Sequence, residues 1–254
     1  MGRSVSVSVV FTDLVGSTEL ASRLGPDESE QLRQAHFGLL RGALARAGGT
    51  EVKNLGDGLM VVFPSVTAAV EGAVAMQQAI GHRNRRARDR LEVRIGIATG
   101  DAVEEEDEKE PDRKDYFGEP VVEAARLCAL AGGGEILATD VVATLARHSG
   151  HRFVPVGDLE LKGLPAPVPA VRVEWALRRG GSSVPLPSRL ESIVRGQGEF
   201  VGRDEELALL GDALDAVLAG EPRTVVVSGE PGVGKTAVVA EFARAAHEDG
   251  LTVL

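Results

Sequence analysis

The chain has 254 residues, 43% hydrophobic and 26% charged, which is enough for one or two globular domains with a sizeable core. Its formal net charge of −10 argues against a general affinity for nucleic acid, because binding phosphate backbones requires a basic surface. The single cysteine, Cys128, excludes an internal disulfide and suits a reducing compartment, and we expect it to be buried as a small hydrophobic residue.

The chain opens with an alternating run, SVSVSVVF, that becomes continuously apolar and predicts a strand buried on at least one face. This run meets Asp13 too early to be the apolar region of a signal peptide. No segment reaches the roughly 18 apolar residues that a membrane span requires. We therefore expect a cytoplasmic protein without membrane contact.

The next elements alternate between helix and strand. From Ser17 to about Ala47 the pattern is helical, with a break at 25–27 where a second helix starts. Residues 50–63, TEVKNLGDGLMVVF, predict a hairpin whose turn is built on 56–58. Helices are then expected over 65–81 and about 119–131, and strands over 91–99, GEILAT, 152–161 and 168–174. This order contains a ferredoxin-like β-α-β-β-α-β core with additional C-terminal strands, so the predicted fold class is α/β (α+β).

The composition changes between Leu177 and Gly198 to RRGGSSVPLPSR and its neighbours, which indicates a linker. An amphipathic helix (RDEELALLGDALDAVLAG), a buried strand (TVVVSG) and a further helix (TAVVAEFARAAHEDG) are expected after it. The predicted organisation is therefore a first domain over 1–176, a linker over 177–199 and the N-terminal part of a second domain over 200–254.

Two charged segments have a simple explanation. Five arginines lie between Arg83 and Arg90, and eight acidic residues lie between Glu104 and Asp115. Both are expected to be solvated loops, although the acidic one could also be an arm over a site. His148 and His151 lack the cysteine neighbours or the HExxH pattern of a zinc site.

Asp13 and Asp57 are the first candidate site residues. Asp13 ends the first predicted strand, and Asp57 lies at the tip of the hairpin that should pair beside it. Two carboxylates on neighbouring strand ends can hold Mg²⁺ and leave coordination positions for substrate phosphates. Taken singly, they could be a helix cap and a turn residue, but their joint occurrence favours the metal site. Backbone N–H groups that could bind phosphate follow at Gly16, Ser17 and Thr18.

The segments FTDLVGST, EVKNLGDGLMVVF and DYFGEPVVEAARL resemble, in order and spacing, the catalytic domain of class III nucleotidyl cyclases, the adenylyl and guanylyl cyclases. The resemblance covers roughly residues 4–175. It implies a homodimer with the active site at the subunit interface, where ATP or GTP becomes the 3′,5′-cyclic nucleotide and pyrophosphate. It also implies two metal ions per site, Mg²⁺ or Mn²⁺, bound by Asp13 and Asp57.

The resemblance implies further roles. Lys53 and Asp115 match the purine-reading pair, Arg126 matches the arginine that stabilises charge on the α-phosphate, and Lys162 matches a lysine that contacts the triphosphate. A Lys–Asp pair implies adenine, because the lysine donates to ring N1 and the carboxylate accepts from the 6-amino group. Guanine presents the opposite edge and should be disfavoured. ATP is therefore the expected substrate, and cyclic AMP the product.

One position departs from the family pattern. Val122 replaces the asparagine that, four residues before the arginine, orients the ribose in the family. Losing one such contact commonly costs on the order of 10²-fold in rate. Glu123 points about 100° away on a helix and is a poor substitute. We expect a slow adenylyl cyclase; the alternative is a weak or inactive pseudo-cyclase that binds nucleotide or dimerises to regulate the attached ATPase.

A second motif, GEPGVGKT at 229–236, matches the phosphate-binding P-loop pattern. Its backbone N–H groups would cradle phosphates, its lysine would reach the β- and γ-phosphates, and its threonine would hold Mg²⁺. With FVGRDEEL, it resembles the start of a signalling ATPase of the AAA/STAND type, so we expect a larger protein to continue beyond residue 254. The ATPase could then be the main function of that protein, but no hydrolysis is expected from this segment alone. The P-loop residues are Gly229, Gly234, Lys235 and Thr236.

Overall fold

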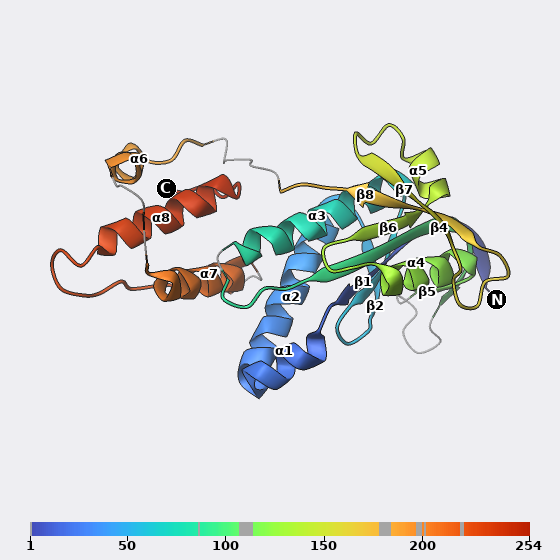
Figure 1. The fold of residues 1–254 in the computed structure, drawn as a ribbon, viewed down its shortest axis with the longest axis horizontal. Coiled ribbons are helices and arrows are strands. Elements are labelled where there is room, and N and C mark those ends of the chain that lie inside the picture. Colours follow the sequence, from blue (N-terminus) through green and yellow to red (C-terminus); the bar gives the residue numbers. More distant parts are fainter. Residues whose placement is uncertain are drawn as a thin grey trace. The chain divides into compact units, whose positions relative to one another are not determined.

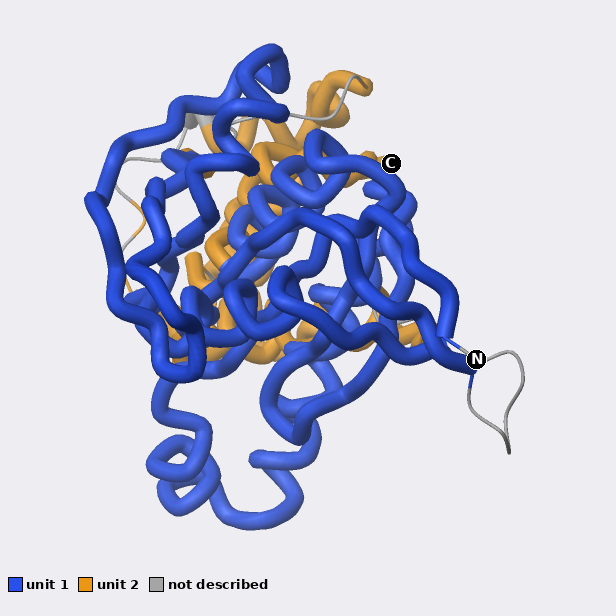
Figure 2. Tube along the Cα trace, turned by 90° about the vertical axis from the view of Figure 1, so that its right-hand side faces the viewer, with its two compact units in different colours: residues 1–80, 91–175 blue, residues 81–90, 176–254 orange. Residues whose placement is uncertain are grey.

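The computed structural model describes residues 2–85, 87–106, 114–177, 184–196, 200, 202–218 and 221–254. They form two compact units, coloured separately in Figure 2. The first unit contains Met1–Ile80 and Leu91–Trp175, and the second contains Gly81–Arg90 and Ala176–Leu254. The predicted domain boundaries, 1–176, 177–199 and 200–254, stay a prediction.

The first unit is built on an eight-stranded sheet with the order β2-β3-β1-β4-β6-β8-β7, and β5 pairs with β4. Within it, β2, β3, β1 and β4 are antiparallel neighbours, which is the expected ferredoxin-like core. The elements of this core are β1 (Arg3–Leu14), α1 (Ser17–Leu24), α2 (Pro26–Ala47), β2 (Thr50–Asn54), β3 (Leu59–Phe63), α3 (Val66–Asn84) and β4 (Val93–Glu106).

The sheet continues beyond this core. The strand β6 runs parallel to β4, and β8 and β7 follow as antiparallel neighbours. Two short elements, β5 and α5, were not predicted from the sequence, and residues 107–113 of the predicted acidic loop lie outside the described residues. These elements are β5 (Lys114–Phe117), α4 (Glu119–Leu130), β6 (Ile136–Thr139), α5 (Asp140–Leu145), β7 (Arg152–Leu159) and β8 (Val168–Glu174).

The alternation along β1 divides the core between the two faces of the sheet. Val10 packs into the cluster formed with α2 and α3, whereas Val7 and Val9 pack on the opposite face with Ala124 of α4. Figure 1 shows α4 and α2 on different sides of the sheet. Gly96 of β4 allows α4 to approach closely, because a Cβ there would lie 2.1 Å from the carbonyl oxygen of Ala124.

The second unit contains the end of α3, α6 (Ser188–Gly196), α7 (Asp204–Leu218) and α8 (Lys235–Glu248). The helix α6 lies where a linker was expected. The predicted strand TVVVSG is wrong: no strand is found among the described residues of this unit, so this run has no neighbour to pair with. Its valines are accordingly exposed, Val226 by 82%. None of the helices that the structure describes is both long and apolar enough to span a membrane.

Candidate active site

Asp13 and Asp57 lie together at one end of the sheet. Asp13 is the penultimate residue of β1, and Asp57 lies in the turn between β2 and β3. Burial raises the pKa of Asp13, a hydrogen bond from Arg94 opposes this rise, and the nearby negative charge of Asp57 adds to it. The two carboxylates are therefore close enough to interact, as expected from the strand order.

The hairpin tip reaches β1 because of glycine. A Cβ on Gly58 would lie only 1.8 Å from the carbonyl oxygen of Thr12, so no larger residue fits at this crossing. The Thr12 hydroxyl accepts a hydrogen bond from the backbone N–H of Leu59 at 2.9 Å. Gly56 adopts φ +101°, and its N–H donates to the Asn54 side chain at 2.9 Å. The sequence GDG thus holds Asp57 beside the end of β1.

Two further side chains hold the carboxylates. The Nε and Nη2 atoms of Arg94 lie 2.6 and 2.5 Å from Asp13 Oδ2. Arg94 was not predicted from the sequence, because only the pairing register of β1 with β4 places it opposite Asp13. The hydroxyl of Ser17, the first residue of α1, donates to Asp57 Oδ2 at 2.8 Å. Arginine binds carboxylates and phosphates alike, so Arg94 also suits an anionic substrate.

The donor set fits a hard divalent cation that is shared with a substrate. The negative charge of Asp57 helps to raise the pKa of Asp13, and a bound cation would relieve this repulsion. Within the described part of the chain, no group of three or more His, Cys, Asp or Glu residues gathers in a geometry suited to a metal. A cation here would therefore take its remaining ligands from water and substrate phosphates, as Mg²⁺ commonly does.

Lys53 and Asp115 form the second pair. The Lys53 ammonium on β2 lies 2.5 Å from Asp115 Oδ2 on β5, and both side chains are about one third exposed (35% and 30%). The ammonium also lies 5.6 Å from the ring centroid of Phe117. Asp115 Oδ1 accepts a hydrogen bond from the backbone N–H of Tyr116 at 2.8 Å. The pair therefore presents a donor and an acceptor side by side at the surface of the unit.

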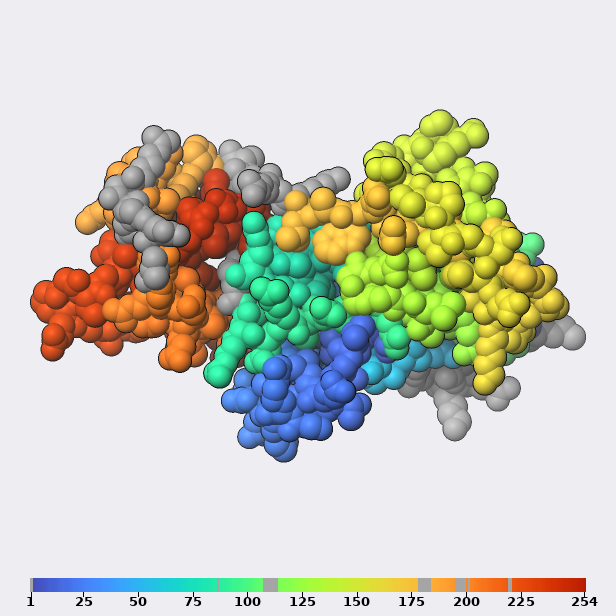
Figure 3. All heavy atoms as spheres, in the orientation of Figure 1, coloured from blue at the N-terminus to red at the C-terminus, as the bar shows by residue number. Residues whose placement is uncertain are grey.

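Arg126 also contacts Lys162, but it bonds to the main-chain carbonyl of Lys162 and not to its side chain. Arg126 Nε donates to the carbonyl oxygen of Lys162 at 3.0 Å. Leu161, which is 4% exposed, anchors this loop in a cluster with Leu127 of α4. Figure 3 shows the yellow surface of this loop region beside the green surface of α4. Val122 lies one turn before Arg126 and is half-buried.

The metal pair and the purine pair draw on different strands of the sheet. Asp13 pairs in register with Arg94 near the start of β4, whereas Asp115 pairs with Glu105 near its end. Lys53, the partner of Asp115, lies nearer to the metal pair, since it pairs with Met60 on β3 and stands four residues before Asp57. The purine pair thus joins β5 to β2, the strand that leads into the turn carrying Asp57.

The P-loop residues open α8, which begins at Lys235 after a left-handed Gly234. The Lys235 ammonium donates to the carbonyl oxygens of Gly229 and Glu230, at 3.0 and 2.8 Å, and so folds onto its own loop.

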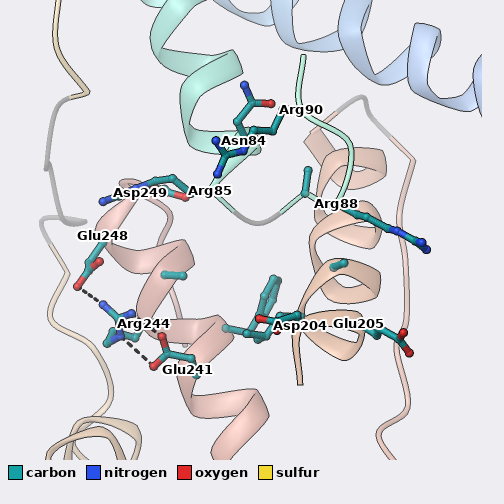
Figure 4. Close-up of a pocket in the computed structure, with 15 residues that line it drawn as sticks. Asn84, Arg85, Arg88, Arg90, Asp204, Glu205, Glu241, Arg244, Glu248 and Asp249 are labelled. Carbon is teal, nitrogen blue, oxygen red and sulfur yellow. Dashed lines mark hydrogen bonds and ion pairs between the residues drawn. The ribbon is translucent and has the colours of Figure 1, made fainter. Parts of the chain in front are cut away.

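A cavity of about 960 Å³ elsewhere in this unit is lined largely by charged side chains (Figure 4). Arg244 there is paired with Glu241 and Glu248, both at 2.5 Å.

The proteins that this chain resembles in sequence are much longer than the chain itself. The chain is 31% identical over 247 residues to a protein of Rhizobium meliloti, with 94% of this chain but 23% of that protein covered. It is 33% identical over 169 residues to an adenylate cyclase of Podospora anserina, with 59% of this chain and 8% of that enzyme covered. The chain thus spans less than a quarter of the length of either relative.

Solved structures resemble the first unit. The adenylyl cyclase CyaB of P. aeruginosa is 26% identical, with a TM-score of 0.61, covering 70% of this chain and 98% of that one. The guanylyl cyclase Cya2 is 27% identical, also with a TM-score of 0.61, covering 69% and 94%. Residues 199–254 match the family model of the AAA ATPase domain. Residues 1–174 match the model of the adenylate and guanylate cyclase catalytic domain, and the chain belongs to this family.

Proposed function

We propose that the chain is an adenylyl cyclase, which converts ATP to 3′,5′-cyclic AMP and pyrophosphate at a homodimer interface. The observation that carries the choice of ATP is the contact of 2.5 Å between Lys53 and Asp115. This pair offers a donor to adenine N1 and an acceptor to the 6-amino group, the reverse of what guanine requires. The relatives include both adenylyl and guanylyl cyclases, so the pair and not the likeness supports the substrate.

The reaction joins the ribose 3′-oxygen to the α-phosphorus, breaks the bond to the bridging oxygen, and releases pyrophosphate and the 3′-hydroxyl proton. Two Mg²⁺ or Mn²⁺ ions bound by Asp13 and Asp57 would assist deprotonation of the hydroxyl and balance the charge of the leaving group. Arg126 would stabilise the negative charge that builds on the α-phosphate. Lys162 and the N–H groups of 16–18 would bind the other phosphates.

The two-subunit site is supported by the family to which residues 1–174 belong. One subunit would supply Asp13 and Asp57, and its partner would supply Lys53, Asp115 and Arg126. This division between two subunits is what the membership of residues 1–174 in the cyclase catalytic family implies. The lone, buried Cys128 supports a cytoplasmic location as part of this proposal.

A product assay tests the proposal. The purified chain is given ATP or GTP with Mn²⁺, and cyclic nucleotide and pyrophosphate are quantified for the wild type, for Asp57→Ala and for Asp158→Ala, a matched change of an exposed aspartate on β7. We expect cyclic AMP to exceed cyclic GMP, and Asp57→Ala to lower the rate on the order of 10²-fold or more, while Asp158→Ala leaves it unchanged. Equal rates for all three proteins would remove the metal assignment, and a preference for GTP would remove the role of the Lys53–Asp115 pair.

A second candidate function is a regulatory module that binds ATP without turning it over and acts on the attached ATPase. Val122 favours it, because a half-buried apolar side chain stands one turn from Arg126, where the family has an amide. The match of residues 199–254 to an AAA ATPase domain supplies the component that such a module would regulate.

A further inference from the structure

His36 is a buried side chain that the reaction above does not use. It lies in α2 and is 0% exposed, unlike most histidines in proteins. Its Nε2 atom lies 3.2 Å from the backbone carbonyl oxygen of Asp57. Because a carbonyl oxygen only accepts hydrogen bonds, Nε2 carries the proton and donates it. A buried polar contact thus joins α2 to the residue at the tip of the β2–β3 hairpin.

The contact completes a set of supports around Asp57. The Ser17 hydroxyl donates a hydrogen bond of 2.8 Å to the Asp57 carboxylate. Gly58, the next residue, packs tightly against the Thr12 carbonyl on β1. The turn itself closes through a hydrogen bond of 2.8 Å from Leu55 N–H to the Gly58 carbonyl. His36 is the support that comes from the helical layer beneath. Without its bond, the carbonyl of Asp57 would have to find another donor or lose stability.

We propose that His36 is a positioning residue, which fixes the backbone of Asp57 so that its carboxylate stands beside Asp13 for cation binding. This inference rests on the proposed function, because it takes Asp57 to be a metal ligand. Outer partners that orient metal ligands typically change metal affinity by 10–100-fold when they are removed. Here the partner acts on the main chain of the ligand and not on its carboxylate.

A packing role is the competing explanation. The His36 ring lies 4.9 Å from the ring of Phe37, centroid to centroid, within the core cluster under the sheet. If the imidazole served only to fill this space, any ring of similar size would replace it. The hydrogen-bond donor and the ring can be separated by two substitutions. His36→Gln keeps a donor at similar reach without the ring, and His36→Phe keeps a ring without the donor.

The experiment measures Mn²⁺ binding directly, with free Mn²⁺ followed by electron paramagnetic resonance in the presence of 3′-deoxy-ATP, which lacks the attacking hydroxyl. Thermal unfolding is recorded for every variant. We expect His36→Gln to bind Mn²⁺ with nearly the wild-type Kd and His36→Phe to bind about tenfold more weakly. Leu40→Ala, one turn later in α2 and also 0% exposed, is the control: it should lower the Tm but keep the Kd.

The other outcomes overturn the inference. A wild-type Kd for His36→Phe, or a loss in Leu40→Ala equal to that in His36→Phe, would show that His36 acts only through packing or overall stability. If His36→Phe does not fold, His36→Met, which is apolar and smaller, takes its place with the same expectation. If Asp57→Ala binds Mn²⁺ as well as the wild type, the proposed metal site itself is wrong. That result is distinct from failure of the His36 inference, in which Asp57→Ala weakens binding but His36→Phe does not.

Discussion

The tip of the β2–β3 hairpin shows how a single residue decides the geometry of a site. Gly58 lies so close to β1 that a Cβ would overlap the Thr12 carbonyl, with 1.8 Å between the atoms. Backbone cannot move aside as a flexible side chain can, so we expect Gly58→Ala to lower the free energy of unfolding by about 3 kcal/mol or more. Any folded fraction should also bind Mn²⁺ weakly, because Asp57 is displaced from Asp13.

Urea unfolding of Gly58→Ala is compared with that of Gly42→Ala in α2. A Cβ on Gly42 would meet its nearest neighbour, the end of the Arg46 side chain, at 3.6 Å, which is ordinary contact. Replacing this helical glycine should therefore raise the free energy of unfolding by about 0.5–1 kcal/mol. If the two variants had the same urea midpoint, the tight crossing of the hairpin over β1 would be refuted.

At the scale of elements, the sequence was informative wherever one strong period ran along the chain. The alternation of β1, the GDG turn and the order of the helices and strands around them predicted the ferredoxin-like core, and with it the proximity of Asp13 and Asp57. The short β5 was not predicted because it follows a run of charged residues. TVVVSG was wrongly predicted as a strand because an apolar pattern does not show whether a second strand is present to pair with it. Arg94 and His36 were missed for a related reason: register and helix packing, which no local pattern encodes, bring them to the carboxylates.

The helix α4 carries a prediction of its own, since Val122 and Arg126 lie one turn apart on the same face. Val122→Asn restores an amide that could orient the ribose, so we expect cyclic AMP formation to rise on the order of 10²-fold. The control is Val121→Asn, the same change at a neighbouring position whose side chain packs against the core beneath α4, where no gain is expected. An unchanged rate in Val122→Asn, with ATP binding intact, would favour the regulatory module over the slow enzyme.

At the scale of the whole molecule, each subunit of the proposed dimer contributes one half to each of two active sites. A dimer with two-fold symmetry has two equivalent interfacial sites, and each takes its metal ligands from one chain and its purine pair and arginine from the other. Asp57→Ala destroys the metal half and leaves the purine half intact, whereas Arg126→Ala does the reverse. Each variant alone should be nearly inactive, because both of its sites carry the lesion.

Mixing the two inactive variants should therefore restore activity. In a mixed dimer, one site collects both lesions and the other collects none, and random pairing makes about half of the dimers mixed. The recovered rate of cyclic AMP formation should then approach about a quarter of the wild-type rate at equal total protein. It should also fall more steeply than linearly on dilution through the dissociation constant of the dimer. A mixture no more active than its components, although both variants still form dimers, would place Asp57 and Arg126 in the same subunit's site and refute the shared interface.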